Sequence, residues 1–194
     1  MENIYGVIAS ILGVVGAATY IFDTYRRKTL PHRFAWLIFL IISVISFSSQ
    51  FALGAKASLY YAGWFVCNNI IIFTLSLRKN GGYGNFTASN FIGLSLAILG
   101  IILWVILSSP LAALISVLIA EVIGVSMVII KSYQHPQTET IAMWALGIIA
   151  SGLNILAVGK LDYSLLAFPI YLFIASIGIV LAILLGRVKS NKGV

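Results

Sequence analysis

Residues 111–130 read LAALISVLIAEVIGVSMVII, and Glu121 is the only charged side chain among these positions. The run follows the short turn Ser108-Ser109-Pro110 and ends before Lys131. A helix needs roughly 20 apolar residues to cross the hydrocarbon core of a bilayer. The stretch therefore predicts a membrane-spanning helix that carries one acidic residue near its middle.

Six further apolar runs, separated by charged or turn residues, have a similar length. They predict spans at 4–22, 33–53, 57–77, 87–107, 141–158 and 163–185. Seven spans use roughly 140 residues, which leaves only short loops in a chain of 194 residues. We therefore expect an all-α polytopic membrane protein with seven transmembrane helices and no separate soluble domain.

The composition agrees with this fold class, because 61% of the residues are hydrophobic and only 9% are charged. Soluble domains usually carry about 25% charged residues, and no soluble fold of this size could bury so much apolar surface. Only Glu2 precedes the first run, where a signal peptide would carry Lys or Arg, so we expect this run to be retained as a span. The single cysteine, Cys67, excludes an intrachain disulfide.

Lysine and arginine are distributed unevenly between the two sides that the alternating spans define. The side of the C-terminus has ten of the twelve cations, and the other side has only Lys56 and Lys160. The positive-inside rule then places the N-terminus outside and the C-terminus in the cytoplasm of a plasma (inner) membrane. These cations lie at the ends of apolar runs and are not interleaved with aromatic residues, so they indicate topology and not a nucleic-acid partner.

The chain contains an internal repeat, in which one constant offset places Gly16 on Gly124. The offset needs no gap through the first two spans of each half. Two tryptophans and two tyrosines match at the same points relative to the predicted span ends, which makes coincidence between apolar helices the weaker explanation. The other matched pairs are Ile21 and Ile129, Tyr25 and Tyr133, Trp36 and Trp144, and Ser43 and Ser151.

A repeat of three spans divides the chain into residues 1–79, a linker span in 80–109, and residues 110–194 with a short cytoplasmic tail. Three spans end on the side opposite their start, and the linker helix returns the chain, so both repeats share one orientation. Parallel repeats of this kind are typical of transporters that bind substrate near the bilayer midplane, between the two halves.

At this point the chain resembles the PQ-loop and SWEET-type transporters, which are built as two parallel three-helix bundles around a linker helix. Residues 19–28, TYIFDTYRRK, are similar to the exit of the family's first helix, where a Pro-Gln pair precedes a basic tail. Here Thr19-Tyr20 replaces that pair, Met127-Val128 replaces it in the second half, and Pro136-Gln137 is out of register. The resemblance covers nearly the whole chain in architecture and implies a distant relative whose substrate is not inherited.

Polar residues inside the spans are the candidates for a solute pathway, because lipid tails offer no hydrogen bonds. Ser43 and Ser46 share one face of the second span with Trp36, and Ser151 and Asn154 share the equivalent face of the sixth span with Trp144. These faces suit the walls of a central pathway. The alternative is that the Ser and Asn side chains bond neighbouring helices and that the tryptophans belong to the interfacial belt.

Asn68 shares a face of the third span with Trp64, and an amide beside an aromatic ring can hold a polar solute. The resemblance also implies a binding role for Asn68, because an Asn on this helix helps to form the pocket in that family. The second Asn of the family's pair is missing, since the equivalent position is Phe173 or Ser176. Structural hydrogen bonding by Asn68 remains an open alternative.

Glu121 is the only acidic residue near the middle of a span, where insertion scales give a charge a cost of roughly 2.5 to 3.5 kcal/mol. We expect it to be protonated at rest or to face water. The resemblance implies a proton-coupling role, because related proton-coupled transporters use an acidic residue on the fifth helix. A neutral Glu bonded to a helix backbone or to Asn154 is the alternative.

These features predict a transporter that moves a small polar solute by alternating access, with protons as a candidate coupling ion and the lipid bilayer as its surroundings. Trp36 and Trp144 are candidate gate residues at the cytoplasmic end, and Pro169 is a candidate gating kink in the last span. The main alternative is a membrane receptor that binds a ligand or peptide without moving it. We expect no enzyme activity, no cofactor and no metal site.

Overall fold

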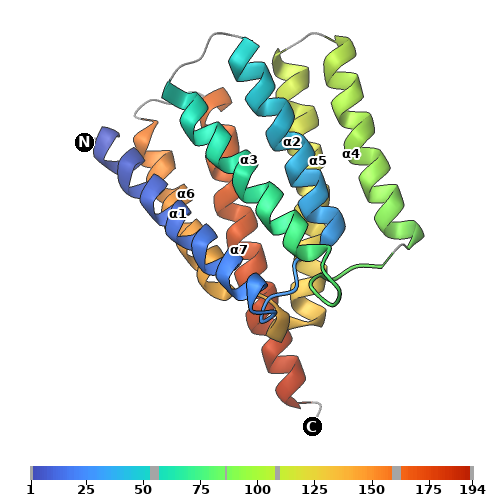
Figure 1. Ribbon diagram of the computed structural model, residues 1–194. Helices are drawn as coiled ribbons and strands as arrows, with labels where there is room; N and C mark the ends of the chain where they lie inside the picture. Colours follow the sequence, from blue (N-terminus) through green and yellow to red (C-terminus); the bar gives the residue numbers. More distant parts are fainter. Residues whose placement is uncertain (1, 53–56, 86, 108–109, 159–162, 193–194) are drawn as a thin grey trace. The chain divides into compact units, whose positions relative to one another are not determined.

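Seven α-helices make up most of the chain in the computed structural model, which describes residues 2–52, 57–85, 87–107, 110–158 and 163–192. Each predicted span coincides with one helix, so the all-α prediction is confirmed for these residues (Figure 1). In chain order the elements are α1 (Glu2–Tyr25), α2 (Arg33–Ala52), α3 (Ala57–Ser76), α4 (Ala88–Leu107), α5 (Pro110–Gln134), the short 3-10 helix η1 (Pro136–Thr138), α6 (Ile141–Ala157) and α7 (Tyr163–Lys192).

Two helices continue well beyond the predicted spans. Helix α5 ends at Gln134 and not at 130, and α7 ends at Lys192 and not at 185. An apolar run marks only the part of a helix that matches the hydrocarbon, whereas Lys and Arg are good helix formers and can extend the helix into water. The last turns of α7 therefore replace part of the predicted cytoplasmic tail.

Three of the described helices are long and apolar enough to cross a membrane, at Ile4–Tyr25, Val117–Gln134 and Leu166–Asn191. At a rise of about 1.5 Å per residue, even the shortest of them spans close to the roughly 30 Å of a hydrocarbon core. Shorter apolar helices lie at Arg33–Ile45, Gly63–Ser76 and Ile141–Ala157. The outward faces of many helices are apolar, as shown by the exposed side chains of Ile11, Ile102 and Ile174.

The helices form two compact units. Unit 1 consists of residues 1–29 and 129–194, and unit 2 consists of residues 30–128. Helix α5 contributes its first part to unit 2 and its last turns to unit 1. These units cut the chain differently from the predicted segments 1–79, 80–109 and 110–194, which follow the sequence repeat and stay a prediction.

Unit 1 is held together by close packing of α1 on α6 and of α6 on α7 (Figure 1). Glycines allow the close approach. A Cβ atom at Gly16 on α1 would lie 3.4 Å from the backbone oxygen of Met143 on α6, and one at Gly147 on α6 would lie 3.0 Å from Oγ of Ser176 on α7. Lipid tails are as apolar as helix surfaces, so the hydrophobic effect does not drive helices together in a bilayer. Small residues at helix crossings favour association there because they let the backbones pack closely.

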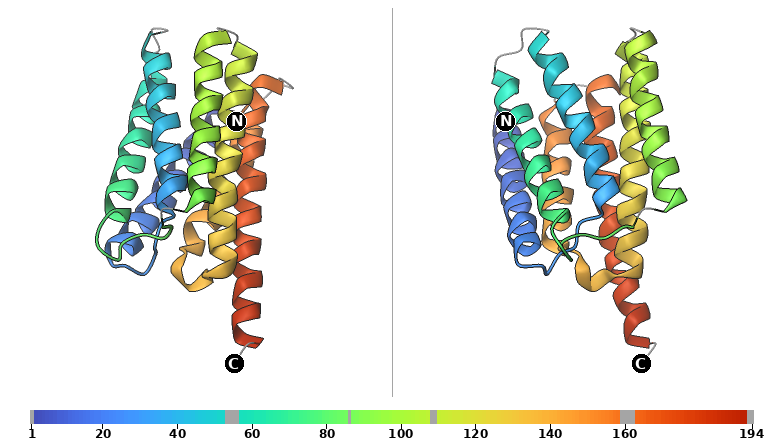
Figure 2. Two further views of the ribbon diagram at one scale, coloured as in Figure 1. Left: turned by 90° about the vertical axis from the view of Figure 1, so that its right-hand side faces the viewer. Right: turned by 45° about the vertical axis from the view of Figure 1, so that its right-hand side comes forward.

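Unit 2 is built around α2, which packs on α3 and α4 (Figure 2). Its buried core joins Ile38 and Ile42 of α2 to Ala120 of α5. Gly124 lies one turn further along α5, where an added Cβ atom would come within 2.6 Å of the Phe39 ring. The Nδ2 of Asn69 on α3 donates to the backbone oxygen of Phe39 at 3.1 Å, which ties α3 to the middle of α2.

The loop after α3 is fastened to the start of α2. The backbone N–H of Tyr83 donates to the oxygen of Pro31, and the N–H of Arg33 donates to the oxygen of Tyr83. The Arg33 guanidinium donates through Nε to the Ser76 oxygen at 2.9 Å and through Nη1 to the Gly84 oxygen at 3.3 Å. Arg33 therefore satisfies a carbonyl at the end of α3 that has no partner within its own helix.

Candidate functional site

Asn68 on α3 is a deeply buried polar side chain with an unsatisfied acceptor. It is 3% exposed, and its Oδ1 accepts no hydrogen bond from any protein group that the structure describes. The next residue, Asn69, is 1% exposed and is bonded to the Phe39 backbone. Buried polar groups are nearly always paired, so an unpaired amide oxygen on an apolar helix is a candidate ligand contact.

The other predicted pathway residues of unit 2 differ from Asn68. Trp64, one turn before Asn68 on α3, is 36% exposed. Ser43 on α2 is buried, and its Oγ donates to the Leu40 oxygen of its own helix at 2.8 Å. The side chain of Ser46 lies outside the described residues. Ser43 thus has a satisfied hydroxyl, and among these described side chains only Asn68 presents a buried group without a partner.

The predicted pathway residues of unit 1 lie on α6. Ser151 is buried and donates to its own helix, at 2.6 Å to the Gly147 oxygen and at 3.2 Å to the Ile148 oxygen. Asn154 lies one turn further along and is half-buried. The structure brings these two residues together on one helix, and their role in a shared pathway stays a prediction.

Glu121 lies on α5 and is 5% exposed. Its neighbours along the helix face α2, because Ala120 packs on Ile38 and Ile42 and Gly124 packs on Phe39. The Glu121 side chain is therefore buried next to the contact between α5 and α2. The proton-coupling role itself stays a prediction.

The three predicted gate residues occupy different surroundings. Trp36 on α2 is buried and meets the Phe39 ring edge-on, with ring centroids 5.6 Å apart. Trp144 on α6 is half-buried, meets Tyr20 of α1 edge-on at 6.3 Å, and donates from Nε1 to Oε1 of Glu139 at 3.1 Å. Helix α7 continues through Pro169.

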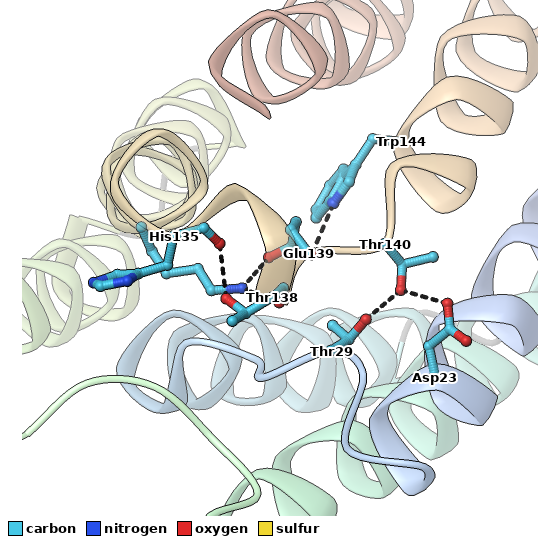
Figure 3. A network of polar contacts seen from close by, with 8 residues as sticks. Asp23, Thr29, His135, Thr138, Glu139, Thr140 and Trp144 are labelled. Atoms are coloured by element: carbon cyan, nitrogen blue, oxygen red, sulfur yellow. Dashed lines mark hydrogen bonds and ion pairs between the residues drawn. The ribbon is translucent and has the colours of Figure 1, made fainter. Parts of the chain in front are cut away.

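A buried ion pair lies where α5 ends and α6 begins, and the sequence did not predict it (Figure 3). Lys131 Nζ lies 2.6 Å from Oε2 of Glu139, with side chains 0% and 1% exposed. The same Nζ donates to the Thr138 oxygen at 2.5 Å. Together with the Trp144 indole, these bonds satisfy both oxygens of the Glu139 carboxylate.

A second group of polar contacts joins α1 to the start of α6 (Figure 3). Thr140, which directly precedes α6, donates from Oγ1 to Oδ2 of Asp23 at 2.9 Å and shares a short hydrogen bond with Oγ1 of Thr29. Thr29 and Thr140 are buried. The end of α1 is shaped for this contact, because Arg27 has a positive φ of 61° and turns the chain so that Thr29 N–H donates to the Asp23 oxygen.

Sequence reasoning missed this cluster because it treated the cations on this side as topology signals and left the nearby acids unused. The signal was present. Asp23 and Glu139 are two of only five acidic residues in the chain, and both lie on the side that carries most of the cations. A carboxylate next to the end of an apolar helix is a candidate partner for a partly buried Lys.

No family model, curated protein or solved structure matches this chain. The function must therefore be inferred from the residues themselves. Within the described part of the chain, no group of three or more His, Cys, Asp and Glu side chains could hold a metal ion. Three features could take part in function. Asn68 can bind a polar group, Glu121 supplies a buried carboxyl group, and Thr140 lies in a cluster of polar contacts.

Proposed function

We propose that this protein is a seven-span membrane transporter that moves a small polar solute by alternating access. Its N-terminus lies outside and its C-terminus in the cytoplasm, in keeping with the positive-inside rule. The observation that carries this proposal is the unpaired Oδ1 of Asn68, which is buried on an apolar helix of unit 2. A buried acceptor without a protein partner costs stability, and such a cost is typical of residues retained for binding.

The internal packing of the two units supports the sequence repeat on which the transport mechanism depends. The offset that places Gly16 on Gly124 also relates α1 to α5, α2 to α6 and α3 to α7. In unit 1, α1 packs on α6 and α6 packs on α7. In unit 2, α5 packs on α2 and α2 packs on α3, so the related helices form related pairs.

A similar side-chain contact occurs at equivalent positions of the two repeats. Ser43 donates to the Leu40 oxygen, and Ser151 donates to the Ile148 oxygen. The repeat offset relates the two donors and also the two acceptors. We therefore treat residues 1–79 and 110–194 as the two repeats of the chain, as in transporters with parallel repeats, and the chain as a distant relative of the PQ-loop and SWEET-type transporters.

Glu121 is the coupling residue in this proposal. It is buried on α5. A buried carboxyl group inside a membrane is more stable when a proton neutralises its charge. Its repeat equivalent is Gly13 on α1, so only one half carries the acid. A group that must gain and lose a proton during each cycle would link solute movement to a proton gradient.

The test is counterflow in proteoliposomes, preceded by a thermal-shift screen of polar solutes on the purified protein. We expect one or more solutes to stabilise the protein and to exchange across the membrane. Asn68→Leu should reduce this exchange at least ten-fold, whereas Thr19→Val, a change on α1, should not. A solute that binds and gives no counterflow would identify a receptor instead and would overturn the transport proposal.

A further inference from the structure

Unit 1 contains direct polar contacts between the two halves of the sequence repeat. Asp23 and Thr29 belong to the first half, and Thr140 belongs to the second half. The Thr140 hydroxyl bonds to both, at 2.9 Å from Oδ2 of Asp23 and at short range to Oγ1 of Thr29 (Figure 3). These bonds join residues 117 and 111 positions apart in sequence.

The contacts lie next to three exposed cations at the end of α1. Arg26, Arg27 and Lys28, which connect Asp23 to Thr29, are all exposed. Hydroxyl hydrogen bonds at such a place can be exchanged for bonds to water without leaving a buried group unpaired. The Gly16 crossing of α1 and α6, by contrast, contains no side-chain hydrogen bond among the atoms nearest to Gly16, which belong to Met143 and Leu146.

Residues of the second half anchor the segment that precedes Thr140. Lys131 at the end of α5 binds both the Glu139 carboxylate and the Thr138 backbone oxygen, so the segment just before Thr140 is anchored from two sides. The Trp144 indole binds the other oxygen of Glu139 from the first turn of α6. The anchor belongs wholly to one half, whereas the Thr140 bonds cross between the halves.

We propose that Thr140, held by Asp23 and Thr29, is a latch that closes the cytoplasmic end of the α1 and α6 pair in this conformation. The inference rests on the proposed function, because alternating access requires contacts at one end of the helices to open during each cycle. The Thr140 bonds then break, while the Lys131 and Glu139 anchor stays intact and keeps Thr140 ready to rebind. In this conformation the latch thus holds the end of α1 beside the start of α6.

A distance measurement tests the latch without any assay of transport. Spin labels are placed at the exposed positions Tyr25 and Gln137 in a Cys67→Ser background, and double electron–electron resonance gives their distance distribution. We expect Thr140→Val and Asp23→Ala to at least double the population at longer distance. Asp23→Asn keeps an acceptor for the Thr140 hydroxyl and should restore most of the short-distance population.

Thr138→Val is the matched control, because the Thr138 hydroxyl donates to the His135 oxygen within its own loop and crosses to nothing in the first half. Its distribution should equal that of the labelled parent. A Thr140→Val distribution that also equals the parent would overturn the latch, whatever the protein transports. All labelled variants must first show the parent's melting temperature within a few degrees.

A disulfide cross-link tests whether opening of the latch is needed for transport. Thr29→Cys with Thr140→Cys, again without Cys67, places two thiols where two hydroxyls touch, which is close enough for a disulfide. Oxidation should lower counterflow at least ten-fold, and a reductant should restore it, whereas each single cysteine should be insensitive. Undiminished flux in the cross-linked protein would overturn the latch. Absence of flux in the reduced parent would count against the proposed function instead.

Discussion

Lys131 Nζ lies 2.6 Å from Oε2 of Glu139, and neither side chain is more than 1% exposed. The lysine lies in the last turn of one helix and the carboxylate precedes the next, so the pair fixes the short connection between α5 and α6. Two opposite charges in such surroundings depend on each other, because a single buried charge without its partner is far less stable than the pair.

Removing one member of this pair should therefore cost more than removing both. We expect Lys131→Met and Glu139→Met each to lower the free energy of unfolding by about 3–5 kcal/mol. The double variant should recover a large part of the loss. Reversible denaturant unfolding in detergent measures this difference, with Lys28→Met at an exposed position as the control. Additive losses in the double variant would contradict the interdependence.

Replacing Trp144 by Phe should separate its two contacts. The ring can still meet Tyr20 edge-on, but Oε1 of Glu139 loses the indole N–H that lies 3.1 Å away. We expect a loss of about 1–3 kcal/mol, as for other hydrogen bonds to charged groups. The same unfolding measurement checks it. A smaller loss when Glu139 is already Met would show that the lost bond is the cause.

Gly186 should not tolerate a side chain. A Cβ atom there would lie 2.5 Å from the backbone oxygen of Tyr133, and the α5 backbone cannot move aside cheaply. We expect Gly186→Ala to destabilise the protein by about 1–3 kcal/mol, as overpacking usually does. Gly13→Ala is the matched control, since no atom in the described part of the chain lies within 4 Å of its added Cβ atom. Equal melting temperatures for the two variants would contradict the packing of α7 on α5.

Adjacent asparagines on α3 should respond in opposite directions to leucine. Asn68→Leu removes an unpaired buried acceptor and should raise the unfolding free energy by about 1 kcal/mol. Asn69→Leu removes the bond to the Phe39 oxygen and should lower it by a similar amount. Thermal unfolding without added solute distinguishes them. Destabilisation by both changes would mean that Asn68 has a structural partner.

Glu121→Gln should uncouple transport from pH. The amide keeps the size of the side chain and cannot release a proton, so proton-driven accumulation should fall at least ten-fold while exchange of solute continues. Uptake at several pH values, with and without an imposed proton gradient, measures both properties. Asp162→Asn, a change outside the predicted spans, is the control. Unchanged pH dependence in Glu121→Gln would remove the coupling role.

Hydropathy and turn residues predicted each of the seven described α-helices, though not the short 3-10 helix η1, because the length of an apolar run and the breaks at Pro, Gly and charged residues are local features of the chain. The ends of α5 and α7 were predicted too early for the same reason. Lys131 and Arg187 interrupt the apolar run but continue the helix, and hydropathy alone cannot distinguish these two properties.

The side-chain contacts were less predictable. Ser43 was chosen as a polar residue within a span, yet its hydroxyl is satisfied by its own helix, an option that any helical Ser has. The bond between Thr140 and Asp23 joins residues 117 positions apart and depends on how α1 meets α6. No periodic pattern in the sequence predicts a contact between residues that far apart. The Thr140 contacts are therefore visible only in the three-dimensional structure.

The chain is synthesised from its N-terminus, so its division into two units affects the order in which the units can form. Unit 2 is one continuous segment, but unit 1 combines the segment 1–29 with the segment 129–194. While the ribosome is still making the middle of the protein, α6, on which α1 packs, has not yet been made. Unit 2 can form at that stage, whereas the contacts of α1 are completed only when α6 emerges, so the first helix made is among the last to find its place.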